Sequence, residues 1–141
     1  MSTINLAIEW GNTGFWYGRI IGLLGTHARA QTKDDLLSIL RDEFVYHCVW
    51  LKQHGFSVEE MEPENWVIKE EVQGISELGE SGGEVALFEF DQREITPDIL
   101  EDATSKMIFN RKDLLDLCHS LDVRIMKRVP SEKKRSIEDI L

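Results

Sequence analysis

The sequence predicts an α+β fold, a small sheet with one packed helix followed by a long C-terminal helix. Three observations indicate this. Apolar and polar residues alternate near the N-terminus, at the two-residue period of a strand with one buried face. From residue 36, apolar residues recur at spacings of three and four, the period of an amphipathic helix. A second helical pattern begins near residue 96. We therefore expect a domain over residues 1–95 and a helical extension over residues 96–141.

The first three predicted strands lie near the N-terminus. In residues 4–10 large apolar side chains occupy every second position, and residues 11–14 contain glycines that tolerate the positive φ of a hairpin turn. Residues 15–21 contain aromatic and β-branched side chains, which favour a second strand. Residues 26–30 alternate more weakly and are expected to form the third strand.

The first helix is expected to begin at Thr32, because Asp35 follows three residues later in a capping-box-like arrangement. Gly55 ends the helical pattern. An apolar stripe lies between these positions and must face the sheet, because a helix of this period buries one side. It consists of Leu36, Leu37, Leu40, Phe44, Cys48 and Leu51.

Several short sequence motifs, in this β-β-β-α order of elements, resemble those of one known family. They are the strand opening INLAIE over residues 4–9, the run Gly14-Phe15-Trp16, the loop glycine Gly25, the small residue Ala30, and Thr32 opening a Thr-x-x-Asp-Leu-Leu motif. The chain thereby resembles the HicB-like antitoxin family over about residues 3–91. This resemblance implies a partial RNase H-like fold and an antitoxin-like role. One departure is Leu24-Gly25-Thr26, where the family usually has a proline followed by Gly-Cys.

Two further strands are expected at residues 65–76 and 84–90, paired as a hairpin that completes the sheet. Residues 79–83, rich in glycine, form the turn between them. This run lacks the lysine and the Ser/Thr that follow the glycines of a P-loop, and it lies among glutamates. The sequence therefore predicts a turn at this position, not a phosphate site.

The second helix is expected to begin at Thr96, an N-cap residue with proline at the first helical position. It should run without a break through residues 103–127, with cations near its end and Pro130 after it. Residues 136–139 carry the capping box of another helix start.

Part of the C-terminal extension resembles a second family. Residues 107–115 and 136–141 are similar to the opening of a DinB-like four-helix bundle, with an Arg-x-Asp-Leu pattern and a Ser-Ile-x-x-Ile-Leu start to the second helix. In that family the metal-binding histidines lie in and after the second helix. Those positions fall beyond Leu141, so the resemblance implies a truncated bundle or a piece of a longer protein.

Composition and charge limit the classes of partner. An apolar fraction of 42% and a charged fraction of 30% are those of an ordinary globular protein. The net charge of −10 is unevenly spread: residues 1–55 carry 5 basic and 5 acidic side chains, residues 56–102 carry 2 and 15, and residues 103–141 carry 9 and 6. The acidic middle would repel a phosphate backbone and the tail would attract one weakly, so the balance argues against nucleic acid.

The expected location is the cytoplasm, without membrane association. No run approaches the ~18 apolar residues of a membrane span, and the N-terminus lacks the basic start and cleavable apolar core of an export signal. Cys48 and Cys118 stand alone in helical stripes, where buried thiols in a reducing compartment are expected.

No catalytic site, metal site or cofactor is expected. His47 and His54 are seven residues apart on one helix, roughly 10 Å at ~1.5 Å per residue, which is too far for one metal ion. Glu43 and His47 are interpreted as a surface ion pair. An RNase H-type reaction needs several strand-borne carboxylates, and Glu9 alone is comparable; it is interpreted as lying on the solvent side of its strand. We therefore predict that the protein is not an enzyme.

A protein-binding role is the favoured interpretation. Trp10, Trp16 and Tyr17 cluster at the first hairpin with Arg19 nearby, and these residue types anchor interfaces. They form the candidate protein-binding surface, with packing of the rings under the helix or the second hairpin as the alternative. The predicted function is a HicB-like, antitoxin-like binding module. Two alternatives stay open: part of a HicB–DinB fusion whose missing helices carry a metal-dependent activity, and a DNA-binding regulator using residues 124–135.

The sequence also predicts a homodimer or a larger even-numbered oligomer. A helix over residues 103–127 would be about 37 Å long at ~1.5 Å per residue, too long for the first domain to cover. Two chains pairing these helices about a two-fold axis would bury the stripe. The candidate interface consists of Met107, Leu114, Leu117, Leu121 and Ile125.

Overall fold

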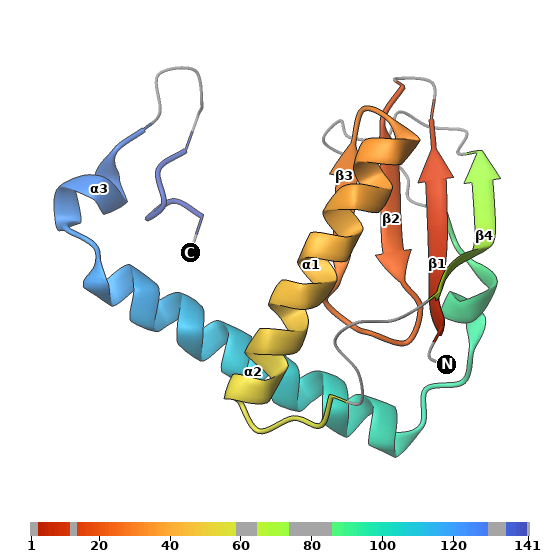
Figure 1. The fold of residues 1–141 in the computed structure, drawn as a ribbon. Helices are drawn as coiled ribbons and strands as arrows, with labels where there is room; N and C mark the ends of the chain where they lie inside the picture. The colour runs from red at the N-terminus through yellow and green to blue at the C-terminus, as the bar shows by residue number, and fades with distance from the viewer. Residues whose placement is uncertain (1–2, 12–13, 59–64, 74–85, 130–134, 141) are drawn as a thin grey trace. The chain divides into compact units, whose positions relative to one another are not determined.

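The computed structural model describes residues 3–11, 14–58, 65–73, 86–129 and 135–140. It confirms the α+β class, with a four-stranded sheet and helices (Figure 1). The chain divides into two compact units, residues 1–94 and residues 95–141. This division falls one residue before the boundary expected from the sequence.

The first unit is built on a mixed sheet whose strands lie in the order β3-β2-β1-β4. The strands are β1 (Thr3–Trp10), β2 (Trp16–Ile20), β3 (His27–Ala30) and β4 (Asn65–Gln73). Neighbours β1, β2 and β3 are antiparallel, as consecutive strands joined by short turns must be. Strand β4 is parallel to β1, and the chain reaches it from β3 by way of a helix that crosses the sheet.

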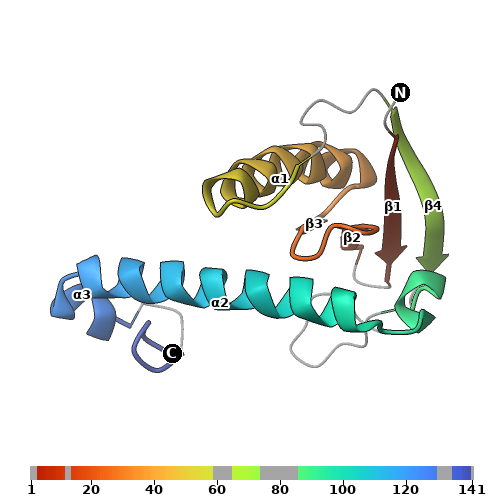
Figure 2. The same cartoon turned by 90° about the horizontal axis from the view of Figure 1, so that it is seen from below.

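That helix, α1 (Lys33–Gln53), packs on one face of the sheet (Figure 2). The Thr32 side chain caps its first turn by accepting a hydrogen bond from the backbone N–H of Asp35. Gly18 lets α1 approach β2 closely, because a Cβ at this position would lie 2.9 Å from a methyl carbon of Leu40. The core between helix and sheet consists of Leu6, Ile8, Ile20, Ala28, Ala30, Leu36, Leu40, Phe44 and Cys48.

The predicted strand at residues 84–90 is wrong over its described part. Residues 86–88 join no strand, and residues from Glu89 form a short 3-10 helix, η1 (Glu89–Gln92). The cause is local: the carboxylate of Asp91 accepts a hydrogen bond from the N–H of Phe88 and turns the chain. Strand β4 pairs with β1 instead of forming the expected hairpin with this segment. The expected turn at residues 79–83 and the end of the strand at residues 74–76 lie outside the described residues.

The second unit begins as the sequence predicts, with Thr96 as N-cap and Pro97 in the first turn of α2 (Pro97–Ser120). The uninterrupted helix expected over residues 103–127 is wrong. Leu121 and Asp122 are extended, and a separate short helix, α3 (Val123–Lys127), follows. Asp122 causes this break, because its carboxylate accepts a 2.7 Å hydrogen bond from the N–H of Arg124 and caps α3.

The capping box at residues 136–139 is present as a single turn. Ser136 donates from its backbone N–H and its hydroxyl to the Asp139 carboxylate, and the N–H of Asp139 donates back to the hydroxyl. The charge-stabilising bonds from Ser136 lower the pKa of Asp139 below its ordinary value of 3.8. The turn contacts the preceding helix through a hydrogen bond from the N–H of Glu138 to the carbonyl of Met126.

Candidate functional site

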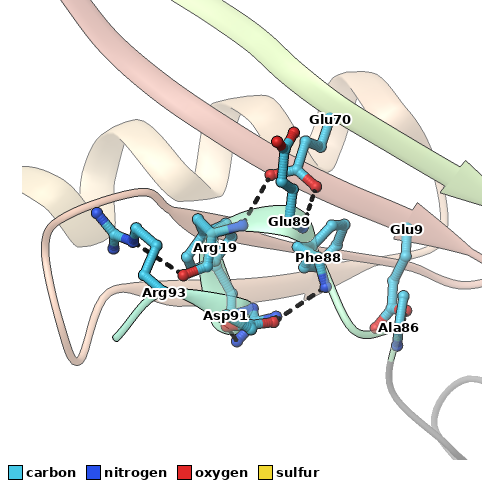
Figure 3. A network of polar contacts seen from close by, with 9 residues as sticks. Glu9, Arg19, Glu70, Ala86, Phe88, Glu89, Asp91 and Arg93 are labelled. Carbon is cyan, nitrogen blue, oxygen red and sulfur yellow. Dashed lines mark hydrogen bonds and ion pairs between the residues drawn. The ribbon is translucent and has the colours of Figure 1, made fainter. Parts of the chain in front are cut away.

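Residues 86–92, which we call the strap, cover the face of the sheet opposite α1 (Figure 3). Strand alternation gives this face the side chains of Ala7, Glu9, Tyr17, Arg19, Glu70 and Val72. A bulge in β4 is needed for this arrangement: the register with β1 skips Lys69, so Glu70 pairs with Ala7. A bulge redirects the side chains that follow it to the other face, and here it turns Glu70 towards the strap.

Arg19 on β2 makes the strongest contacts with the strap. Its guanidinium binds both carboxylate oxygens of Asp91, at 3.1 and 2.7 Å. The same planar group lies 4.9 Å from the ring centre of Phe88 and 5.0 Å from that of Phe90. The two rings are stacked, with centres 5.7 Å apart, and Phe88 is almost fully buried. Arginine suits this position because it forms a two-pronged ion pair and stacks on aromatic rings at once.

Main-chain groups of the strap are satisfied by side chains from the sheet. The carboxylate of Glu70 accepts hydrogen bonds from the N–H groups of Glu89, at 2.7 Å, and Phe90, at 3.4 Å. Arg93, just beyond the strap, donates to the carbonyl oxygen of Phe90 at 2.9 Å. The strap is therefore held at its C-terminal half by an ion pair, two rings and several backbone hydrogen bonds.

Glu9 lies under the N-terminal half of the strap and is fully buried. Its Oε2 accepts a hydrogen bond from the N–H of Ala86, whereas its Oε1 has no hydrogen-bond partner among the described residues. Burial raises the pKa of Glu9 above its ordinary value of 4.5; the Ala86 bond and the charge of Arg19 partly offset this effect, and the charge of Asp91 adds to it. The interpretation of Glu9 as solvent-facing is wrong, because the strap covers it.

The four residues of the candidate protein-binding surface do not share one face. Trp10 and Trp16 are opposite each other in the register, with ring centres 5.8 Å apart, and Trp16 packs against the core on the α1 side. Tyr17 and Arg19 lie on the strap side, where Arg19 is bound by Asp91 and the ring of Tyr17 lies tilted against that of His27, with centres 5.9 Å apart. The structure therefore brings these residues together in two pairs, and their role in binding a partner stays a prediction.

A second candidate site lies on α2 of the second unit. Seven positions with alternating spacings of three and four form a line along this helix and its C-cap, which we call the seam: Leu100, Ala103, Met107, Asn110, Leu114, Leu117 and Leu121. The exposed fractions are 60% for Leu100, 65% for Met107, 43% for Leu114 and 57% for Leu117. Ile125, the last residue of the predicted interface, is exposed on α3 beyond the helix break. Only the part of that interface up to Leu121 lies on one line.

Sequence reasoning missed the strap and its partners Glu9, Glu70 and Asp91. The available signal was the aromatic pair Phe88 and Phe90 next to an acidic residue, which indicates a segment that packs on something basic and apolar. The pairing itself joins residues 72 positions apart in the sequence, as in Arg19 with Asp91, and no local pattern specifies it.

Comparison of the chain with protein-family models, with curated proteins and with solved structures found no match to any of them. In the described part of the chain, no helix has both the length and the apolar character needed to cross a membrane. Among the same residues, no three His, Cys, Asp or Glu side chains are grouped as metal ligands would be.

Proposed function

We propose that the protein is a non-catalytic protein-binding module that pairs with a second copy of itself through the seam on α2. The observation that carries the proposal is the exposure of Leu100, Met107, Leu114 and Leu117 along one line of a 24-residue helix. Full burial of one such side chain contributes about 1.5–3 kcal/mol. Burial of the exposed seam residues would thus contribute on the order of 5 kcal/mol of free energy per chain. This is a large part of a typical domain's stability.

The spacing of the seam favours a helix as its partner. Alternating steps of three and four average 3.5 residues, the period at which two helices stay in contact along their length. A second copy of α2 supplies the same spacing, and a two-fold arrangement buries both seams in one closed contact. Asn110, in the middle of the seam, is the kind of polar residue that fixes the register of such helix pairs.

For the first unit we propose a HicB-like role, in which this domain binds a further protein. The support is the element order, three strands, one helix and a fourth strand, which matches what the sequence resemblance implies. Exposed apolar side chains on the outer side of α1, among them Tyr46, Val45 and Val49, give this unit a surface for such a contact.

The self-association is tested by replacing two exposed residues of the seam together, Leu114→Asp and Leu117→Asp. We expect this double variant to be monomeric under conditions in which the unmodified protein is dimeric, because four buried carboxylates per dimer cannot be paired. Sedimentation velocity measures the change, and circular dichroism checks that the helices remain.

The matched control is Ile108→Asp. Ile108 lies on the same helix and is 60% exposed, but it is outside the seam. It introduces one carboxylate per chain, against two in the double variant, and should leave the dimer intact. A double variant that keeps the mass of the unmodified protein would contradict the proposal, and so would a control that dissociates as completely as the double variant.

A further inference from the structure

We propose that docking of the strap on the sheet takes up a proton at Glu9, so that the strap is held most firmly at acidic pH and more loosely as the pH rises. The inference concerns the first unit alone and does not depend on self-association. It rests on the asymmetry between the two halves of the strap.

In the C-terminal half of the strap, the charged group and the backbone N–H groups have partners on the sheet. Asp91 has the guanidinium of Arg19, the N–H groups of Glu89 and Phe90 have the carboxylate of Glu70, and Phe88 is buried between them. The N-terminal half rests on Glu9, a fully buried carboxyl with one hydrogen bond, from Ala86. A buried charge with a single hydrogen bond is costly, whereas a neutral carboxyl at the same place costs far less.

Among the described residues, the groups that face Glu9 do not supply a free positive charge. On β2, Tyr17 is directly opposite in the register, and burial raises the pKa of its hydroxyl, so it stays neutral. Arg19, next to Tyr17's face position on β2, is the cation nearest in the register, but Asp91 binds it in a two-pronged pair and repels Glu9 in turn. On β3, one strand further from Glu9, Arg29 and His27 share this face, and Arg29 lies over the ring of Phe15.

The other described neighbours of Glu9, on β4 and β1, do not compensate for its charge either. On β4, Val72 is the register partner of Glu9, and Glu70 carries the same charge sign as Glu9. On β1 itself, the residue two positions earlier on this face is Ala7. Desolvation therefore dominates, and it is the largest cause of the raised pKa of Glu9.

Release of the strap would expose Glu9 to water and return its pKa towards 4.5. The docked state binds the proton more tightly than the open state, so docking is strongest below pH 4.5. It weakens as the pH rises from 4.5 through the raised pKa of Glu9, by up to tenfold per pH unit, and levels off above that pKa. The strap is thus a proton-linked cover on this face of the sheet.

Amide hydrogen exchange by NMR tests the proposal on the full chain. The protection factors of Glu89 and Phe90, whose N–H groups bind Glu70, report on docking, and the ¹³C shift of the Glu9 carboxyl reports its titration. In the unmodified protein we expect both protection factors to fall as the pH rises above 4.5, along the titration curve of Glu9. Constant protection as the pH rises, or a Glu9 carboxyl that titrates at 4.5 or below, would overturn the proposal.

Two variants localise the effect. Glu9→Gln keeps the size and one acceptor oxygen of the side chain but cannot ionise, so its protection factors should be flat with pH. Glu89→Gln removes an equal charge from the exposed side of the strap and should retain the response of the unmodified protein. If Glu9→Gln retains that response, the proposal fails. If Glu9→Gln does not fold, the carboxyl titration of the unmodified protein decides alone.

Discussion

Arg19 joins the sheet to the strap through two kinds of contact that few other side chains combine. Its two bonds to Asp91 fix the direction of the guanidinium, whose central carbon lies over the rings of Phe88 and Phe90. The ion pair is about three-quarters buried, with 26% and 21% of the two side chains exposed. It is therefore less screened than an ion pair on the open surface.

We expect Arg19→Lys to lower the free energy of unfolding by about 1–2 kcal/mol. Lysine keeps the charge but loses the second hydrogen bond to Asp91 and the planar stacking on the rings. Urea denaturation measures the loss. Arg29→Lys is the control, because Arg29 is exposed and covers the single ring of Phe15; it should change stability by less than half as much. Equal effects of the two substitutions would contradict this role of Arg19.

At the level of single residues, the sequence predicts which face of a strand a side chain lies on more reliably than it predicts whether that side chain is buried. The alternation of β1 correctly separates Glu9 from Leu6 and Ile8, because strand geometry is local. The burial of Glu9 depends on Ala86, which is 77 positions later in the sequence. The bulge at Lys69, which places Glu70 on the strap side, could not be predicted from the sequence either, because a bulge depends on how two strands pair.

At the level of elements, helix starts are well specified. Thr32 accepts from the N–H of Asp35 at 3.1 Å and donates its hydroxyl to the same residue's carboxylate at 2.7 Å. Thr96 and Pro97 start α2 in the same local manner. These signals are correct because an N-cap needs partners within three residues and no tertiary contact.

We expect Thr32→Ala to lower the free energy of unfolding of the first unit by about 1 kcal/mol, since alanine leaves an N–H of the first turn without its acceptor. Thr32→Ser, which keeps the hydroxyl, should restore most of this stability. Thermal unfolding followed at 222 nm gives both values. A serine variant as unstable as the alanine variant would mean that the methyl group of Thr32, and not its hydroxyl, is what matters.

Element ends and strand partners are less well specified by the sequence. The apolar spacing continues through Leu121 and Ile125, so periodicity predicts one long helix, yet the Asp122 cap begins a new one. Residues 86–90 have the apolar content of a strand, yet the hydrogen bond from Phe88 to Asp91 turns the chain into η1 from Glu89. In both cases a single carboxylate that binds a nearby N–H overrides the pattern of several apolar residues.

At the level of the whole molecule, the chain consists of two compact units, and we propose a separate binding role for each. The first unit has its own core between α1 and the sheet. The second unit places a line of exposed apolar side chains on α2, which a stable protein normally covers. The seam was visible in the sequence because its spacing is local; its exposure needed the structure, because burial depends on everything that packs against a helix.

The solution mass of the unmodified protein tests self-association through the seam without any substitution. One chain has a mass of 16.3 kDa. Light scattering coupled to size-exclusion chromatography, at chain concentrations from about 1 to 100 µM, should give twice this mass at the upper end. For micromolar pairing the mass should shift towards one chain on dilution, whereas tighter pairing keeps twice the mass throughout. A constant mass of 16.3 kDa over the whole range would contradict the account.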